Sequence, residues 1–206
     1  MNNGDLSGGN LYLRAALGGA RGELGLILAQ GSGDDDPRTG EGNLTRIATD
    51  GGFSITEVWE DSIMPDRGYY PGGLGSPLVR GYRELENTKI TQGFVSFRPT
   101  PNLRLFASVS MIRASEAIRE WSDVNGNGIL ELDEFGDGMS DELGSEFDLR
   151  MEWTIDRRLE VELAAGRFLP RVASSYLLYG HDGAQEAANE IRATVTVPIP
   201  EFSLGG

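Results

Sequence analysis

Residues 146–155, EFDLRMEWTI, decide the fold class of this chain. Every second side chain in the stretch is apolar, and the side chains between them are charged or polar. Successive side chains of an extended strand point to opposite faces, so this alternation predicts a β-strand with one apolar face. The apolar face holds Phe147, Leu149, Met151, Trp153 and Ile155, and the polar face holds Glu146, Asp148, Arg150, Glu152 and Thr154.

This strand begins a predicted hairpin, and the same construction recurs along the chain. A tight turn at Asp156 and Arg157 leads into LEVELAAGRF, which alternates in the same way. Upstream, alternating stretches flank the turn segments PTPN and GGARG, whose proline and glycine residues are typical of turns. The seven predicted strands are residues 10–17, 23–30, 90–98, 103–112, 146–155, 159–168 and 190–199.

The connections between these strands alternate strictly between short and long. The three tight turns are followed by long segments at about residues 31–87, 114–144 and 170–188. Outer-membrane barrels have tight turns at one rim and long loops at the other, and their strands of about ten residues cross the bilayer at a tilt. The sequence therefore predicts an all-β, up-and-down antiparallel β-barrel of transmembrane type. The alternative is a soluble sandwich or jelly roll, which usually has shorter loops.

A single domain is expected over residues 1–206, but an odd number of strands is a difficulty for a closed barrel. Single-chain outer-membrane barrels normally have an even number of strands. Either residues 53–60, FSITEVWE, form a further strand, or the chain is the C-terminal part of a larger barrel. The residues after Met1, NNGDLSGG, lack the basic and apolar regions of a signal peptide, which fits a processed, partial or cytosolic chain.

The composition limits the classes of partner. The chain has 32 acidic and 18 basic residues and a formal net charge of -14, so we expect no nucleic-acid partner. It has no cysteine, which excludes disulfides and thiolate metal sites. No run of about 18 apolar residues predicts a transmembrane helix, whereas transmembrane β-strands give only a weak hydropathy signal.

Two stretches of the chain carry a family resemblance. Residues 86–118, ENTKITQGFVSFRPTPNLRLFASVSMIRASEAI, and residues 142–170, ELGSEFDLRMEWTIDRRLEVELAAGRFLP, resemble the later portion of the alginate-export family of outer-membrane porins. The resemblance covers about residues 86–170. The present chain is much shorter than those porins, is strongly acidic, and continues with SLGG after Phe202 where a terminal aromatic is usual.

The resemblance implies a function and a location. It implies a monomeric channel in the outer membrane, or at the cell surface, of a Gram-negative-type bacterium, in contact with outer-membrane lipid. The channel would pass small anionic solutes, anionic sugars or polysaccharide through a polar lumen rich in arginine. Taken with the alternation of the strands, it places six charged residues in that lumen: Arg14, Arg104, Arg150, Arg192, Asp148 and Glu152.

Residues 123–134, DVNGNGILELDE, match the ligand spacing of an EF-hand calcium loop. Gly128 stands at the sharp turn, and the sequence SEAIREW just upstream has helical composition. We therefore expect a Ca²⁺ cofactor in an external loop at residues 115–143, against the alternative of an Asn-Gly-rich surface turn. Two asparagines in place of carboxylates predict weak binding, of the kind found in extracellular modules. The predicted ligands are Asp123, Asn125, Asn127, Ile129, Glu131 and Glu134.

Two functions follow from these patterns, and neither is enzymatic. His181 beside Asp182 is the only histidine, and no nucleophile stands at a defined spacing from it, so we expect no catalysis. The first function is a porin-like channel with a calcium-stabilised external loop. The second is a secreted or surface β-barrel subunit that assembles into a homo-oligomer or filament through calcium-stiffened acidic loops. The surroundings of the apolar strand face distinguish them.

Overall fold

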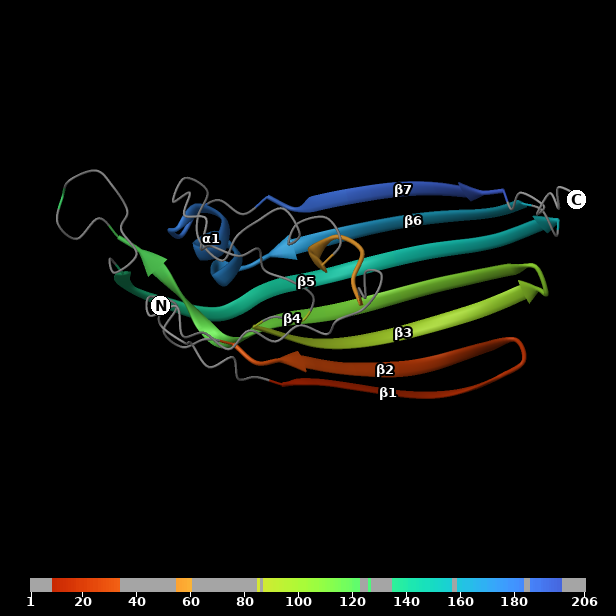
Figure 1. Cartoon of the computed structure of the whole chain (residues 1–206), viewed down its shortest axis with the longest axis horizontal. Helices are drawn as coiled ribbons and strands as arrows, with labels where there is room; N and C mark the ends of the chain where they lie inside the picture. The colour runs from red at the N-terminus through yellow and green to blue at the C-terminus, as the bar shows by residue number, and fades with distance from the viewer. Residues whose placement is uncertain are drawn as a thin grey trace, which may run out of the picture.

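The chain folds into one antiparallel sheet of seven strands, in which each strand pairs with the next along the sequence (Figure 1). The computed structural model describes residues 9–33, 55–60, 85, 87–122, 126, 135–156, 159–183 and 186–197. The strands are β1 (Asn10–Gly19), β2 (Gly22–Gly31), β3 (Thr88–Thr100), β4 (Leu103–Trp121), β5 (Phe135–Asp156), β6 (Leu159–Pro170) and β7 (Ala188–Thr196). The predicted all-β class and the seven predicted strands are confirmed.

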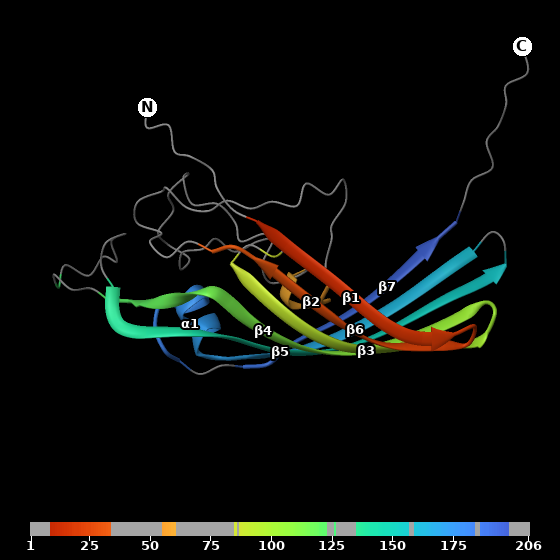
Figure 2. The same ribbon diagram turned by 90° about the horizontal axis from the view of Figure 1, so that it is seen from below.

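Strand register follows the alternation of the sequence. In the central pair, Ser108 lies opposite Asp148 and Ala107 lies opposite Leu149, so polar residues meet on one face and apolar residues on the other. We call these the inner face and the outer face. The sheet is curved, and residues 55–60 lie against its inner face, on the concave side (Figure 2). The predicted assignment of residues to the two faces of β5 is therefore confirmed.

The sheet is open within the described residues. There, β1 pairs only with β2 and β7 pairs only with β6, which leaves two strand edges. The sheet has the up-and-down strand order of a barrel. Because neither edge is paired with the other in the described part of the chain, closure into a barrel remains a prediction.

The hairpin of β4 and β5 is longer than the sequence indicated. Residues 115–121, predicted as helical, belong to β4, and residues 135–143, predicted as loop, belong to β5. Ile118 pairs with Ser140 and Trp121 pairs with Phe135, after a register irregularity that begins at Arg113. The helical prediction for residues 115–121 was wrong because an antiparallel partner across the hairpin outweighs local helix propensity.

The third long segment contains a helix that the sequence did not predict, α1 (Val172–Tyr179). Its start is held to β5, because the Arg171 N–H donates to the Leu143 carbonyl at 2.9 Å and the Ser174 hydroxyl donates to the same oxygen. It ends at Gly180, whose φ of 83° is left-handed and whose N–H donates to the Tyr176 carbonyl. In the described part of the chain, no helix has the length and apolar character needed to cross a membrane.

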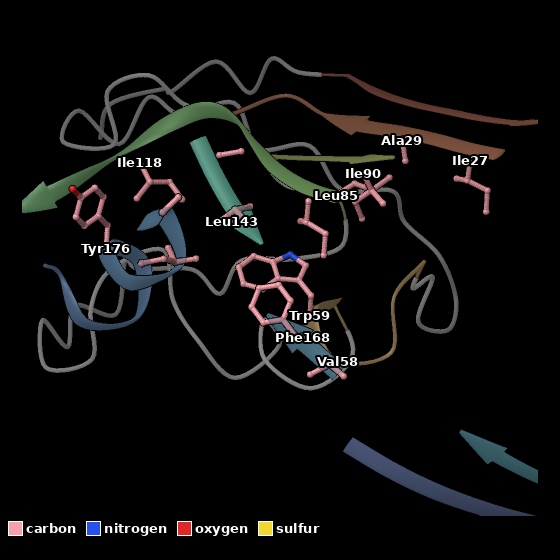
Figure 3. Close-up of a cluster of buried hydrophobic side chains, with 14 of the residues drawn as sticks. Ile27, Ala29, Val58, Trp59, Leu85, Ile90, Ile118, Leu143, Phe168 and Tyr176 are labelled. Carbon is pink, nitrogen blue, oxygen red and sulfur yellow. The ribbon is translucent and has the colours of Figure 1, made fainter. Parts of the chain in front are cut away.

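Buried apolar side chains gather at the long-loop end of the inner face, where the sheet meets α1 and residues 55–60 (Figure 3). Trp59 and Leu143 are both 0% exposed, and Tyr176 and Leu177 approach from the helix. Burial, followed by the nearby carboxylates of Glu120 and Asp182, raises the pKa of the Tyr176 phenol. This cluster fixes the positions of the segments that lie over the inner face.

Candidate functional site: an inward turn on a two-faced sheet

The outer face is covered with large apolar side chains that remain exposed. Ile191 on β7 is 86% exposed, Leu17 on β1 is 84% exposed, and Leu149 on the interior strand β5 is 62% exposed. An apolar hollow of about 520 Å³ lies on this face, lined mainly by residues such as Leu105, Met151 and Leu163. Monomeric soluble proteins rarely expose contiguous apolar patches of more than a few hundred Å². This face is therefore suited to an apolar environment.

The other exposed apolar residues of the outer face come from all seven strands. They are Leu11, Leu13, Leu24, Leu26, Leu28, Val95, Phe97, Leu105, Val109, Met111, Phe147, Trp153, Ile155, Leu163 and Val195. Met151 lies on the same face and is half-buried.

The inner face carries the charged residues that were predicted for a lumen. Arg14 donates to Glu23 at 2.7 Å, and Arg104 lies 3.3 Å from Glu152 and 3.8 Å from Glu23. These pairs link β1, β2, β4 and β5 in a partly exposed network. All six predicted residues share this face of the sheet, and their place in a lumen remains a prediction.

Residues 55–60, ITEVWE, form a compact turn that is closed by its own side chains; we call it the inward turn. The Glu60 carboxylate accepts hydrogen bonds from the N–H groups of Ile55 at 2.6 Å and Thr56 at 3.2 Å. The Thr56 hydroxyl in return accepts a bond from the Glu60 N–H at 3.3 Å. The proposed extra strand at residues 53–60 was wrong for residues 55–60, because these bonds satisfy the backbone within the turn.

The sheet binds the backbone of the inward turn at two points. Glu146, fully buried on β5, accepts hydrogen bonds from the N–H groups of Val58 at 2.6 Å and Trp59 at 2.9 Å, one on each carboxylate oxygen. Gln92 on β3 donates through its amide to the Ile55 carbonyl at 2.8 Å. Glu146 holds two successive backbone N–H groups of the turn, whereas Gln92 holds one carbonyl, so Glu146 is the principal anchor.

Packing adds to these hydrogen bonds. The Trp59 ring lies against the Phe168 ring on β6 (Figure 3), and the two ring centroids are 5.0 Å apart. Val58 lies over Gly166, where a Cβ atom would come within 2.5 Å of the Val58 Cγ2 atom. The absence of a side chain at position 166 therefore allows the turn to approach the sheet.

Glu57 of the inward turn joins two of the predicted lumen arginines. Arg150 donates to the Glu57 Oε1 atom through Nε at 2.9 Å and also through Nη2, and Arg192 donates to Oε2 at 2.8 Å. The Glu57 side chain is 5% exposed, whereas those of Arg150 and Arg192 are 32% and 36% exposed. A single buried carboxylate thus holds two arginines that remain open to the concave side.

Asp148 is the other acidic group buried beside the turn. It is 3% exposed, and its Oδ2 atom accepts a hydrogen bond from the Ser108 hydroxyl at 3.1 Å. Its neighbour on the same face of β5 is Glu146, two residues away. The predicted lumen residue Asp148 therefore supports the structure beneath the turn and is not open to the concave side.

The six predicted calcium ligands in residues 123–134 lie outside the described residues. In the ranges that are described, no group of three or more histidine or acidic side chains has the geometry to hold a metal ion. Calcium binding remains a prediction from the loop sequence.

The sequence did not indicate the roles of Glu57, which joins two arginines, and Glu146, which binds the backbone of the inward turn. Glu57 lies in a stretch whose alternation resembles that of a strand, and no local pattern relates it to arginines about 90 or more residues away. No protein-family model matches the chain, and no curated protein matches it. The resemblance of residues 86–170 to alginate-export porins therefore remains a prediction.

Proposed function

We propose that the chain forms a porin-like channel of the outer membrane, with the outer face of the sheet against lipid and the inner face along the path of the solute. One observation carries the proposal: large apolar side chains are exposed across all seven strands, while the opposite face holds paired charges and buried carboxylates. This is the distribution of a membrane barrel, in which strands alternate between lipid and a polar interior.

The arginines of the inner face favour an anionic solute over a neutral one. Arg14, Arg104, Arg150 and Arg192 all lie on it, and the last two are joined by a single carboxylate. Guanidinium groups bind carboxylates in a bidentate geometry, so carboxylated sugars fit this face better than neutral sugars. Calcium at residues 123–134 would stiffen a loop at the long-loop end of the sheet, beyond the hairpin of β4 and β5.

A second function is favoured by the open edges of the sheet. Unpaired strand edges are templates for pairing with another chain, and β1 and β7 each have one within the described residues. A surface or secreted subunit that assembles edge to edge would use β1 and β7, and its apolar face would be covered by neighbouring copies.

Single-channel recording distinguishes the two functions. Protein purified in detergent should give discrete conductance steps in a planar lipid bilayer, with anions of small carboxylated sugars carried in preference to potassium. Protein that was unfolded before addition is the control. Soluble polymers that form without detergent, together with the absence of conductance steps, would refute the channel function and favour the assembly function.

A further inference from the structure

We infer that Arg150 and Arg192 form a binding site for a solute carboxylate, and that Glu57 of the inward turn occupies this site as an internal substitute for the ligand. The inference deepens the proposed channel function, and it depends on that function for the class of solute.

The geometry around Glu57 is that of a bound carboxylate ligand. Arg150 directs two donors, Nε and Nη2, at one carboxylate oxygen, and Arg192 directs Nη2 at the other. Both oxygens are therefore occupied by guanidinium groups from the sheet. Arg150 and Arg192 come from β5 and β7, on either side of Ala164 in β6, so the sheet register sets their separation before the turn is added.

The arginines are partly open although their carboxylate partner is buried. Roughly a third of each arginine side chain is exposed, against 5% of Glu57. Arg192 also lies 3.7 Å from Glu162 and 3.8 Å from Glu190, which are longer contacts than its 2.8 Å bond to Glu57. A solute carboxylate that replaced Glu57 would accept hydrogen bonds from the same donors. It would lie closer to Arg192 than the carboxylates of Glu162 and Glu190 do.

The inward turn can release Glu57 without losing its other anchors. Glu146 binds the N–H groups of Val58 and Trp59, and Gln92 binds the Ile55 carbonyl, so the backbone has supports on both sides of residue 57. Only the Glu57 side chain needs to rotate away for the site to become free. The exchange is a competition between two carboxylates for one pair of arginines.

The competition has a measurable consequence. A ligand that binds only when Glu57 has left has its apparent affinity reduced by the fraction of molecules in which the site is free. If Glu57 occupies the site in about nine molecules out of ten, removing its charge should tighten binding about tenfold.

The test is calorimetric titration of the whole chain in detergent micelles at low salt, with sodium glucuronate as the probe and glucose as the neutral comparison. Glu57→Gln should bind glucuronate about tenfold more tightly than the unchanged protein, and neither protein should bind glucose. Adding Arg150→Gln to Glu57→Gln should remove the gain. Glu160→Gln is the matched control, because it removes one negative charge from an exposed position on the same face without releasing either arginine; it should change the affinity less than twofold.

Equal affinities of Glu57→Gln and the unchanged protein would overturn the inference, and so would an equal gain in Glu160→Gln. Trp59 emission, in a background with Trp121→Phe and Trp153→Phe, reports whether the turn is still in place. If Glu57→Gln proved unfolded, Glu57→Asp would decide, because its shorter carboxylate cannot reach both arginines equally; a gain of a few-fold supports the inference and no gain refutes it.

This titration does not depend on conduction. Glucuronate binding that follows the predicted order in a protein without conductance would preserve the site and refute the channel. Conductance in a protein whose Glu57→Gln variant binds glucuronate no more tightly would preserve the channel and refute the site.

Discussion

Gly166→Ala should displace the inward turn from the sheet and destabilise the fold. The new Cβ atom would lie 2.5 Å from the Val58 Cγ2 atom and 3.0 Å from the Asp148 Oδ1 atom. Apolar carbons in contact stay about 3.5 to 4.0 Å apart, so the turn must move by about 1 Å. Overpacking of this kind typically costs about 1–3 kcal/mol of unfolding free energy.

Gly93→Ala is the matched control, because Gly93 lies in β3 and a Cβ atom there would meet nothing within 4 Å. The same chemical change should therefore be neutral or should stabilise by up to about 1 kcal/mol. Urea unfolding in detergent micelles, followed by strand circular dichroism, gives both free energies. Trp59 emission should shift in Gly166→Ala and not in Gly93→Ala.

A double-mutant cycle tests whether the loss of unfolding free energy comes from the contact between positions 58 and 166. Val58→Ala removes the methyl group that Gly166→Ala would strike, so the double variant should be more stable than the sum of the two single effects predicts, by about 1 kcal/mol or more. Strictly additive effects, or equal costs for Gly166→Ala and Gly93→Ala, would refute the docking of the inward turn on β6.

Further predictions concern the aromatic anchor, the calcium loop and the outer face. Trp59→Ala should cost about 3–5 kcal/mol of unfolding free energy, measured by the same urea titration, because the side chain is fully buried against Phe168. Chelating calcium should increase amide hydrogen exchange in residues 123–134 while exchange in the strands stays slow, and calorimetry should show Glu134→Gln weakening calcium binding far more than Glu131→Gln. Leu149→Arg should destabilise the lipid-embedded protein by about 2–4 kcal/mol, whereas an arginine at a water-exposed position would change stability by less than about 0.5 kcal/mol.

The strands could be predicted from the sequence because each carries its own alternation. Residues 146–155 show five apolar and five polar positions in strict turn, and the observed register keeps residues 146–154 on their predicted faces. The same pattern located the hairpin partners, since a one-residue slip would turn every apolar side chain to the inner face.

The contacts over the inner face could not be predicted in this way. Residues 55–60 have the composition of a strand, yet Glu60 closes them into a turn and Glu146, distant in sequence, binds that turn to the sheet. Residues 115–121 favour a helix locally, yet a partner strand across the hairpin makes them extended. In both segments the decisive interactions join residues far apart in the chain, which periodicity does not register.

The central claim is that the outer face contacts lipid, and Trp153 tests it most directly. Trp153 lies on the outer face and is 44% exposed, whereas Trp59 is fully buried over the inner face. Each would be studied as the only tryptophan, with Trp121 and the other one replaced by phenylalanine, in vesicles whose lipid chains carry bromine. Bromine quenches tryptophan on contact, so the Trp153 protein should lose most of its emission and the Trp59 protein little. Equal and weak quenching of both proteins would contradict the claim and would place the outer face against protein or water.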